Sequence, residues 1–369
     1  MSPVPRPRRD PPAAALRGRA ATAPAATAAD PRVPGGGADP AAAGGARAVA
    51  AGPAAPPGAP APFPVAPRIR GVGVVTGWGP GVEPDAAAVP DDRAGIVPAP
   101  TPVLDGDRFR RATRECLLAV AAARAAVVDA GLAPEAVAGS GTGILFVSAT
   151  GYAPANRAFL EDEGSTTLHF PYTSPSAVPG EVTIELGIRG PYLNLMGGGP
   201  ATLHALWSAA RWLADGTAAR VLVLAVEVVQ ELRDLFARAG RVWAGPLVEG
   251  AACLLLEPGR GAPLRWSAVG LDVDGRSAGA VGSTLEGVLA AERPRLVWSG
   301  ITAPAVARAE QAAIARAAGP VPRAPRTGEA LALGPLLALA RAHRLGAERP
   351  WLLTAGWRSD YGAMLWPRD

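Results

Sequence analysis

An α/β fold is predicted by three observations: a change of composition near residue 68, short apolar runs typical of buried strands, and helical segments that alternate with them. The 369 residues include 45 Gly and 40 Pro, which are densest before residue 68, although 49% of the chain is hydrophobic. The segment 1–67 is therefore interpreted as a disordered leader rich in Pro, Ala and Gly. The remaining chain, about 300 residues, is long enough to bury a large core.

The first half of this remainder, predicted over 68–258, begins with a strand and a long helix. The strand covers 69–76 (IRGVGVVT) and ends in a turn rich in Gly and Pro. The helix covers 111–131 and stops at a glycine. Further apolar runs predict strands over 143–148, 192–196, 221–228 and 251–256, a helix over 202–214, and either state over 182–186.

The second half, predicted over 259–369, is shorter and repeats the scheme more loosely. Its pattern predicts strands over 295–298, 351–354 and 362–366 and helices over 305–318 and 328–343. Alternating strands and helices in both halves are typical of the α/β class.

Composition excludes several kinds of site. Cys116 and Cys253 are the only cysteines, and His169, His204 and His343 form no ligand motif, so neither a disulfide framework nor a metal centre is expected. Every basic residue is Arg, which excludes chemistry that depends on lysine, and no cofactor is expected. The 36 basic residues are scattered and nearly balanced by 32 acidic ones, a pattern that disfavours nucleic-acid binding.

No export or membrane segment is predicted. The pair Arg8-Arg9 is followed by Pro and further Arg instead of the apolar run of a signal peptide. No apolar stretch reaches the roughly 18 residues that a membrane span needs. A cytoplasmic protein that does not bind membranes is therefore expected.

The segment 192–202 predicts a strand that turns sharply into a helix. Residue 199 then lies at a helix N-terminus, where backbone amides and the helix dipole favour negative charge. Enzymes built in this way place a nucleophile at such a turn. Here the turn holds only Gly197, Gly198, Gly199 and Pro200, so the alternative interpretation is a tight structural turn.

Three blocks of sequence resemble the β-ketoacyl synthases of the thiolase superfamily. They are 68–83 (RIRGVGVVTGWGPGVE), 186–227, whose centre reads GPYLNLMGGGPATLHALWSAARWLADG, and 247–257 (LVEGAACLLLE). Arg93 to Ile96 (RAGI) also resembles a family loop that reads GRSGI. The resemblance covers nearly all of the chain after residue 68. It implies a thiolase-like fold, in which two similar halves form five alternating αβαβα layers.

The residues that carry the family's chemistry are absent at the positions that the resemblance assigns. Gly199 stands where the family has its nucleophilic Cys, and Ser299 and Glu329 stand where it has its two His, with Gly328 as the alternative for the second. Without a thiolate or imidazoles, decarboxylative condensation is not expected. The family's glycine-rich gate is replaced by Trp357, Arg358, Ser359 and Asp360.

Among β-ketoacyl synthases the chain most resembles the chain-length factor, a subunit that lacks the nucleophile. The resemblance implies a heterodimer with an active ketosynthase, paired through the strand 192–196, and a chamber for a chain carried by an acyl carrier protein. Tyr192, Asn194 and Met196 are then interface candidates. On the helix 111–129 and the loop 170–175, bulky residues such as Phe170 and Tyr172 either stop the growing chain or serve as ordinary packing.

Two other functions stay open. One is a divergent acyltransferase or hydrolase that acts on carrier-bound thioesters and uses Ser299 beside Glu329. The other is an acyl-chain-binding homodimer. Cys116 and Cys253 lie in apolar runs and are expected to be inert. His204 is five residues beyond Gly199, about 140° around the helix, which favours packing or a surface position.

Overall fold

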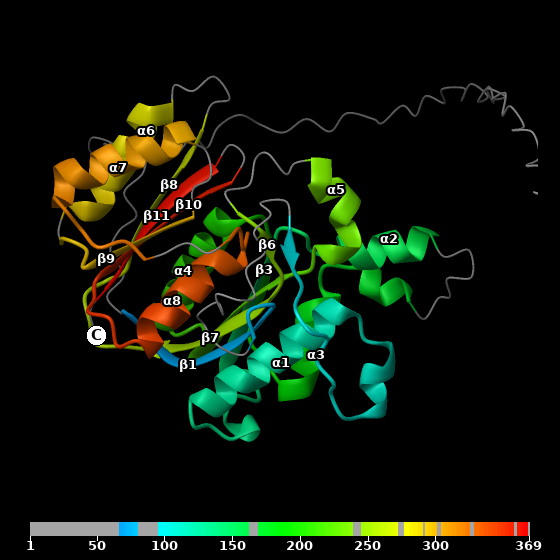
Figure 1. Ribbon diagram of the computed structural model, residues 1–369. Coiled ribbons are helices and arrows are strands. Elements are labelled where there is room, and N and C mark those ends of the chain that lie inside the picture. The colour runs from blue at the N-terminus through cyan, green and yellow to red at the C-terminus, as the bar shows by residue number, and fades with distance from the viewer. Residues whose placement is uncertain are drawn as a thin grey trace, which may run out of the picture. The chain divides into compact units, whose positions relative to one another are not determined.

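Two β-sheets organise the chain and lie on either side of a central pair of helices (Figure 1). The computed structural model describes residues 66–79, 95–161, 169–238, 245–271, 277–290, 292–300, 304–324, 328–357 and 360–367. Contacts divide the chain into two units, Met1–Pro53 and Ala54–Asp369, and all described residues belong to the second. Most of the leader predicted over 1–67, like Arg358 and Ser359 of the predicted gate, lies outside the described residues.

The first sheet has five strands in the order β1-β7-β5-β3-β4. Strands β3, β4 and β5 are parallel, whereas β7 runs antiparallel to both β1 and β5. The sheet therefore has β1 and β4 at its edges. Its strands are β1 (Pro67–Thr76), β3 (Thr142–Ser148), β4 (Tyr192–Met196), β5 (Arg220–Glu227) and β7 (Gly250–Pro258).

The second sheet repeats this pattern with four strands, in the order β8-β11-β10-β9. Its strands are β8 (Arg265–Gly270), β9 (Leu296–Gly300), β10 (Trp351–Trp357) and β11 (Asp360–Trp366). At the position that corresponds to β4, a single parallel bridge joins Val297 of β9 to Arg323. Two short strands, β2 (Ile96–Val97) and β6 (Leu247–Val248), form a separate parallel pair.

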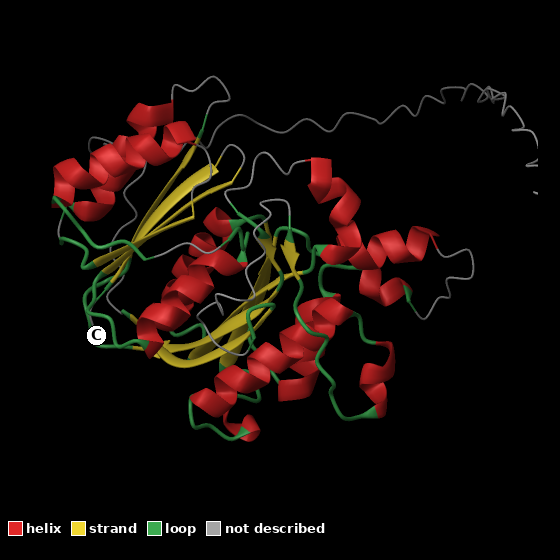
Figure 2. Cartoon of the chain, in the orientation of Figure 1, coloured by secondary structure: helices red, strands yellow, loops and turns green. Residues whose placement is uncertain are grey.

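Helices complete the five layers (Figures 1 and 2). α1 (Arg114–Asp129) and α3 (Ala177–Leu186) cover the outer face of the first sheet. α4 (Gly199–Ala214) and α8 (Leu333–Arg344) lie between the sheets. α6 (Ser277–Leu289) and α7 (Pro304–Ala318) cover the outer face of the second. The shorter helices are α2 (Ala153–Glu161), α5 (Arg233–Arg238) and the 3-10 turns Asp107–Arg111, Pro134–Ala136, Phe170–Thr173 and Gln230–Leu232.

Alternating side chains of the central strands divide the core between the layers. On β3, Leu145 and Val147 face the central helices, whereas Ile144 and Phe146 face α1. Glycines on β1 allow α1 to approach the sheet, because a Cβ on Gly73 would lie 1.9 Å from the carbonyl oxygen of Ala122. The glycines of the IRGVGVVT run therefore serve packing.

The predicted α/β class and five-layered arrangement are confirmed, with corrections at individual elements. Residues 182–186 are helical and belong to α3, which ends at Gly187 with φ 64°. The helix predicted over 328–343 begins only at Leu333, because residues 328–332 form a bridge and a turn instead. The sequence patterns missed α2, α6 and β8. The boundary predicted at residue 258 stays a prediction.

Candidate functional site

The turn after β4 places Gly199, the residue that the resemblance assigns to the position of a nucleophilic Cys, at the first position of α4. Gly198 is the N-cap and Pro200 occupies the first helical turn. Gly199 is buried, and a Cβ added to it would lie 2.7 Å from the Cβ of Ala355 on β10. That separation is far below a normal carbon–carbon contact of about 3.5–4.0 Å. The structure thus leaves no space for a side chain at this position.

The start of α8 and the residues just before it also pack against Gly199. The Pro335 ring and the Leu331 carbonyl oxygen would lie 3.7 and 3.8 Å from a Cβ on Gly199. Leu331 has φ 47°, a left-handed conformation that is rare for a branched residue and costs free energy. Its side chain is buried against Val229 and Leu247, which holds the backbone in this conformation.

The buried carboxylate of Glu227 connects two segments of the site by hydrogen bonds. The residue ends β5 and is fully buried, and its Oε1 accepts hydrogen bonds from the N–H of Ala149 (2.7 Å) and of Ala332 (3.1 Å). Its Oε2 accepts from both the N–H (3.0 Å) and the hydroxyl (2.8 Å) of Thr150. Burial raises the pKa of the Glu227 carboxyl to about 7, against these donors, which favour the charged form. Glu227 thereby ties the loop after β3 to the start of α8.

Ser299 faces away from Gly199. On β9, Val297 packs among the residues of α6 and α7, whereas Trp298 packs in the core around α4 and α8. Ser299 alternates with Trp298 and so shares the outer face with Val297. There its hydroxyl lies near the Glu310 carboxyl of α7. The position assigned to the first His therefore points into the outer layer.

Glu310 is the centre of a buried polar group in that layer. Its carboxyl accepts a hydrogen bond from the Tyr361 hydroxyl (3.4 Å) and has Arg323 at 3.9 Å. Burial raises the pKa of Glu310, and neighbouring Thr354 and Ser299 hydroxyls offset this only in part.

A pH dependence of stability follows from the raised pKa of Glu310. The folded state binds a proton more tightly than the unfolded state, so the free energy of unfolding falls as pH rises from 4.5 through the folded pKa. Glu310→Gln replaces the titrating carboxyl by an amide. The free energy of unfolding of the variant is therefore expected to fall less than that of the wild type as pH rises. Urea unfolding of both proteins at pH 5 and pH 8 measures it. Equal losses in wild type and variant would contradict the assignment.

Glu329 lies in a different environment. Its N–H donates to the Pro246 carbonyl (2.8 Å) and its carbonyl accepts from Val248 (2.9 Å), which joins it to β6. Its carboxylate accepts the N–H of Leu331 at 3.1 Å. Glu329 therefore stabilises the turn that covers Gly199, whereas Ser299 interacts with α7. The two side chains thus have different neighbours, the N–H of Leu331 for Glu329 and the Glu310 carboxyl for Ser299.

The two thiols and His204 do not supply a substitute nucleophile. Cys116 is buried in α1, and burial raises the pKa of its thiol to about 12. Cys253 is fully buried in β7, and its pKa is raised further. Both thiols thus stay protonated at neutral pH. His204 stacks on Trp266 with ring centroids 5.3 Å apart, on the flank of α4.

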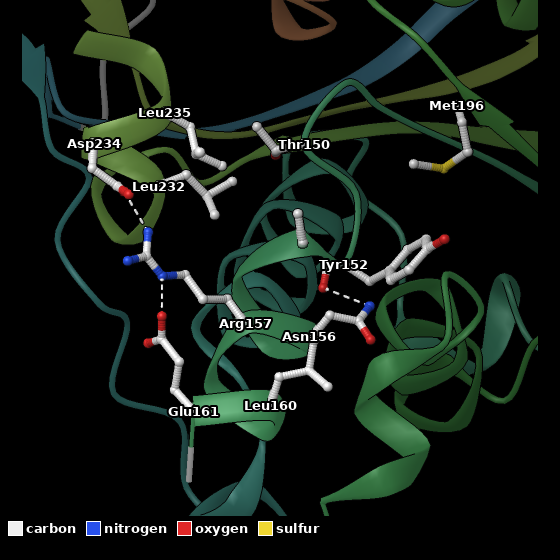
Figure 3. Close-up of a pocket in the computed structure, with 11 residues that line it drawn as sticks. Thr150, Tyr152, Asn156, Arg157, Leu160, Glu161, Met196, Leu232, Asp234 and Leu235 are labelled. Atoms are coloured by element: carbon white, nitrogen blue, oxygen red, sulfur yellow. Dashed lines mark hydrogen bonds and ion pairs between the residues drawn. The ribbon is translucent and has the colours of Figure 1, made fainter. Parts of the chain in front are cut away.

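A hollow of about 760 Å³ opens beside the end of β4 (Figure 3). Met196 and Thr150 line it on one side, and α2 and α5 line it on the other. Arg157 lies among these residues, where its guanidinium donates to Glu161 (2.8 Å) and to Asp234. The apolar part of the wall comes from Ala153, Leu160, Met196, Leu232 and Leu235.

Of the interface and chamber candidates, only Met196 lines this hollow. Phe170 is 63% exposed and packs edge-on against Phe159, with centroids 6.0 Å apart. Tyr172 packs on the α1 side of the core and donates to the Glu181 carboxylate at 3.3 Å. Tyr192 lies at the other end of the exposed strand β4, with Asn194 between them. None of the lining residues comes from α1.

Among the residues that the structure describes, no group of three or more His, Cys, Asp or Glu side chains could hold a metal ion. None of the helices in the described ranges is long and apolar enough to cross a membrane. Asp360 of the predicted gate begins β11 and is exposed.

Comparison with known proteins defines the fold first. The structure matches the ishigamide ketosynthase/chain length factor (TM-score 0.63, 20% identity, 81% of this chain and 98% of that one). It also matches a β-ketoacyl synthase from Burkholderia phymatum (TM-score 0.67, 16% identity, 83% and 100%). A third match is AntDE:AntF, a type II PKS acyl-carrier protein in complex with its ketosynthase (TM-score 0.67, 14% identity, 82% and 99%). The chain therefore has the thiolase-like fold of the ketosynthases.

A family model also matches part of the sequence. Residues 85–240 match the model of the β-ketoacyl synthase N-terminal domain. A search of the curated proteins finds no match. The resemblance to β-ketoacyl synthases that the sequence motifs indicated is thus confirmed.

Proposed function

We propose that the chain is a catalytically inactive, ketosynthase-like subunit of the chain-length-factor type. It pairs with an active ketosynthase in a cytoplasmic type II polyketide or fatty-acid-like pathway. The observation that carries the proposal is Gly199, which has neither a nucleophile nor space for one. A fold retained without its reactive group points to a role in binding and assembly.

The residues at the site also lack the groups that decarboxylative condensation requires. The reaction needs a thiolate to hold the acyl chain and neutral imidazoles to stabilise the developing negative charge. Gly199 cannot form a thioester, and Glu329 would bring a carboxylate to the place where an imidazole acts. Each lost element raises the barrier by several kcal/mol, as an order of magnitude.

The free edge of β4 is the proposed pairing surface. Gly197 donates its N–H to Ser148 of β3, and Pro191 accepts on the same side, so residues 192, 194 and 196 direct their N–H and C=O groups away from β3. Tyr192 and Met196 are 44% and 48% exposed. Unpaired edges with exposed apolar side chains favour the addition of a partner's strand. The proposed partner is a ketosynthase with the same fold.

The hollow beside β4 is the proposed contribution of this chain to the chamber. It adjoins the pairing edge through Met196, and its apolar wall suits the methylene or polyene part of a chain held by an acyl carrier protein.

Changing the volume of this hollow is expected to change product length. Met196→Trp fills it, so the pair should release products shorter by at least one extension unit, and Met196→Ala should give longer ones. Mass spectrometry of the products from the reconstituted pair measures this. Phe170→Ala, which lies outside the hollow, is the control. Identical product profiles from all variants would contradict the proposed chamber.

Co-expression with the ketosynthase encoded nearest to it, followed by native mass measurement, tests the proposed function. A one-to-one heterodimer is expected, with condensation that depends on the ketosynthase's own nucleophile. A chain that remains alone and turns over carrier-bound thioesters would overturn the proposal. A homodimer that binds acyl chains without any ketosynthase would also overturn it.

A further inference from the structure

Three aromatic rings form a partly exposed cluster, here called the aromatic flank, on the outward side of α4. His204 and Trp207 come from α4, and Trp266 comes from β8. His204 stacks on Trp266 at an interplanar angle of 18°, and the two indoles have centroids 5.3 Å apart. All three residues keep part of their surface exposed to solvent.

The aromatic flank lies on the same side of the molecule as the free edge of β4. α4 follows β4 directly through the turn at Gly197 and Gly198, and it packs against both β4 and β8. These are edge strands, one from each sheet. α8 packs against β9, the opposite edge of the second sheet, and both central helices contact β1. The aromatic flank therefore continues the surface that begins at β4.

If a partner pairs through β4, the position of its strand also fixes which of its elements lies against the aromatic flank. A strand added to β4 lies about 4.8 Å away and extends the sheet. In a partner of the same fold that pairs antiparallel, about an axis perpendicular to the sheet, that strand is followed by its own central helix over the same face of the sheet. This helix must then arrive beside the outward side of α4, where Pro200, His204, Trp207 and Arg211 share one face.

Resting on the proposed pairing, we propose that the aromatic flank seats the central helix of a ketosynthase partner that presents small side chains there. Packed helices lie about 8–10 Å apart, and bulky rings on one helix need small residues on the other.

A second copy of this chain would fit less well. In a two-fold pair, each α4 would meet the same face of the other, so both would present His204 and Trp207 at one crossing. Charge does not oppose the proposed partner, because the exposed charge of this helix face, Arg211, has Asp215 at 3.8 Å. The aromatic flank thus favours a heterodimer over a homodimer.

The test measures the dissociation constant of the full-length chain with the co-expressed ketosynthase by analytical ultracentrifugation. Trp207→Ala is expected to weaken pairing about tenfold or more, because large aromatic anchors dominate interface energies. Leu345→Ala is the matched control, an apolar side chain that is 60% exposed at the far end of α8. It should leave the constant unchanged.

Oxidative footprinting of the unmodified chain provides the second measurement, which does not depend on how a variant folds. Trp207 and Trp266 should be oxidised in the free chain and protected in the pair. Protection of both, with weakening only by Trp207→Ala, supports the proposal. Pairing that is unaffected by Trp207→Ala, with no protection, overturns it while the proposed function stands. If the wild-type chain does not pair, or pairs only with itself through this flank, both are overturned.

Discussion

Replacing Gly199 by cysteine is expected to destabilise the chain by about 1–3 kcal/mol and to create no ketosynthase activity. The new Cβ would lie 2.7 Å from the Cβ of Ala355, an atom that cannot move without shifting β10. The thiol would also lack the two imidazoles of an active ketosynthase, because the positions that the resemblance assigns to them hold Ser299 and Glu329. Thermal unfolding and a decarboxylation assay measure the two effects.

A compensating substitution separates this clash from other effects of the cysteine. Ala355→Gly removes the opposing methyl group, so the double variant should recover most of the stability that Gly199→Cys loses. The single variant Ala355→Gly serves as the reference for the cycle. An unfolding temperature of Gly199→Cys equal to that of the wild type would show that a side chain fits at residue 199, which would contradict the close packing against Ala355.

Asn194→Pro is expected to weaken pairing with the ketosynthase about a hundredfold, roughly 3 kcal/mol. Residue 194 directs its N–H toward the free edge of β4, so proline removes a donor that the partner strand would use, and its ring obstructs the approach. Native mass spectrometry of the co-expressed pair should show free chains in place of the heterodimer.

The neighbouring position provides the control for this result. Residue 195 directs its N–H toward β3, so Leu195→Pro should lower the unfolding temperature of the chain itself. Asn194→Pro should leave that temperature nearly unchanged. A heterodimer that survives Asn194→Pro would exclude β4 as the pairing strand.

Local sequence patterns could predict most of the layers and the turn at Gly199, but not what closes that turn. Strand and helix periodicity depend on neighbouring residues, which is why β4, β5 and α7 agree with their predicted ranges within a few residues. The cover over Gly199 comes from Leu331, Pro335 and Ala355, more than 130 positions away. Only the folded chain brings these residues together.

The environment of Ser299 shows a second limit. A strand alternates its side chains, so a shift of one residue in the assignment of a position exchanges the two faces of a sheet. The resemblance assigned Ser299 to the first His, but its neighbours Trp298 and Gly300 are the residues on the inner face. The hollow was missed for another reason. Its wall combines the loop after β3, the end of β4, α2, the 3-10 turn Gln230–Leu232 and α5, and the sequence patterns predicted neither α2 nor α5.

The closed turn at Gly199 also determines how many acyl chains the proposed pair can bind covalently. In the proposed pair, two subunits of one fold contain a single reacting centre, so each pair can hold one covalent acyl chain at a time. In the second subunit the space beside Gly199 is closed by Leu331, Pro335 and Ala355, so its proposed contribution to the chamber is the hollow beside β4. Such an assembly builds one molecule per cycle, and its size limit can change without altering the residues that make each bond.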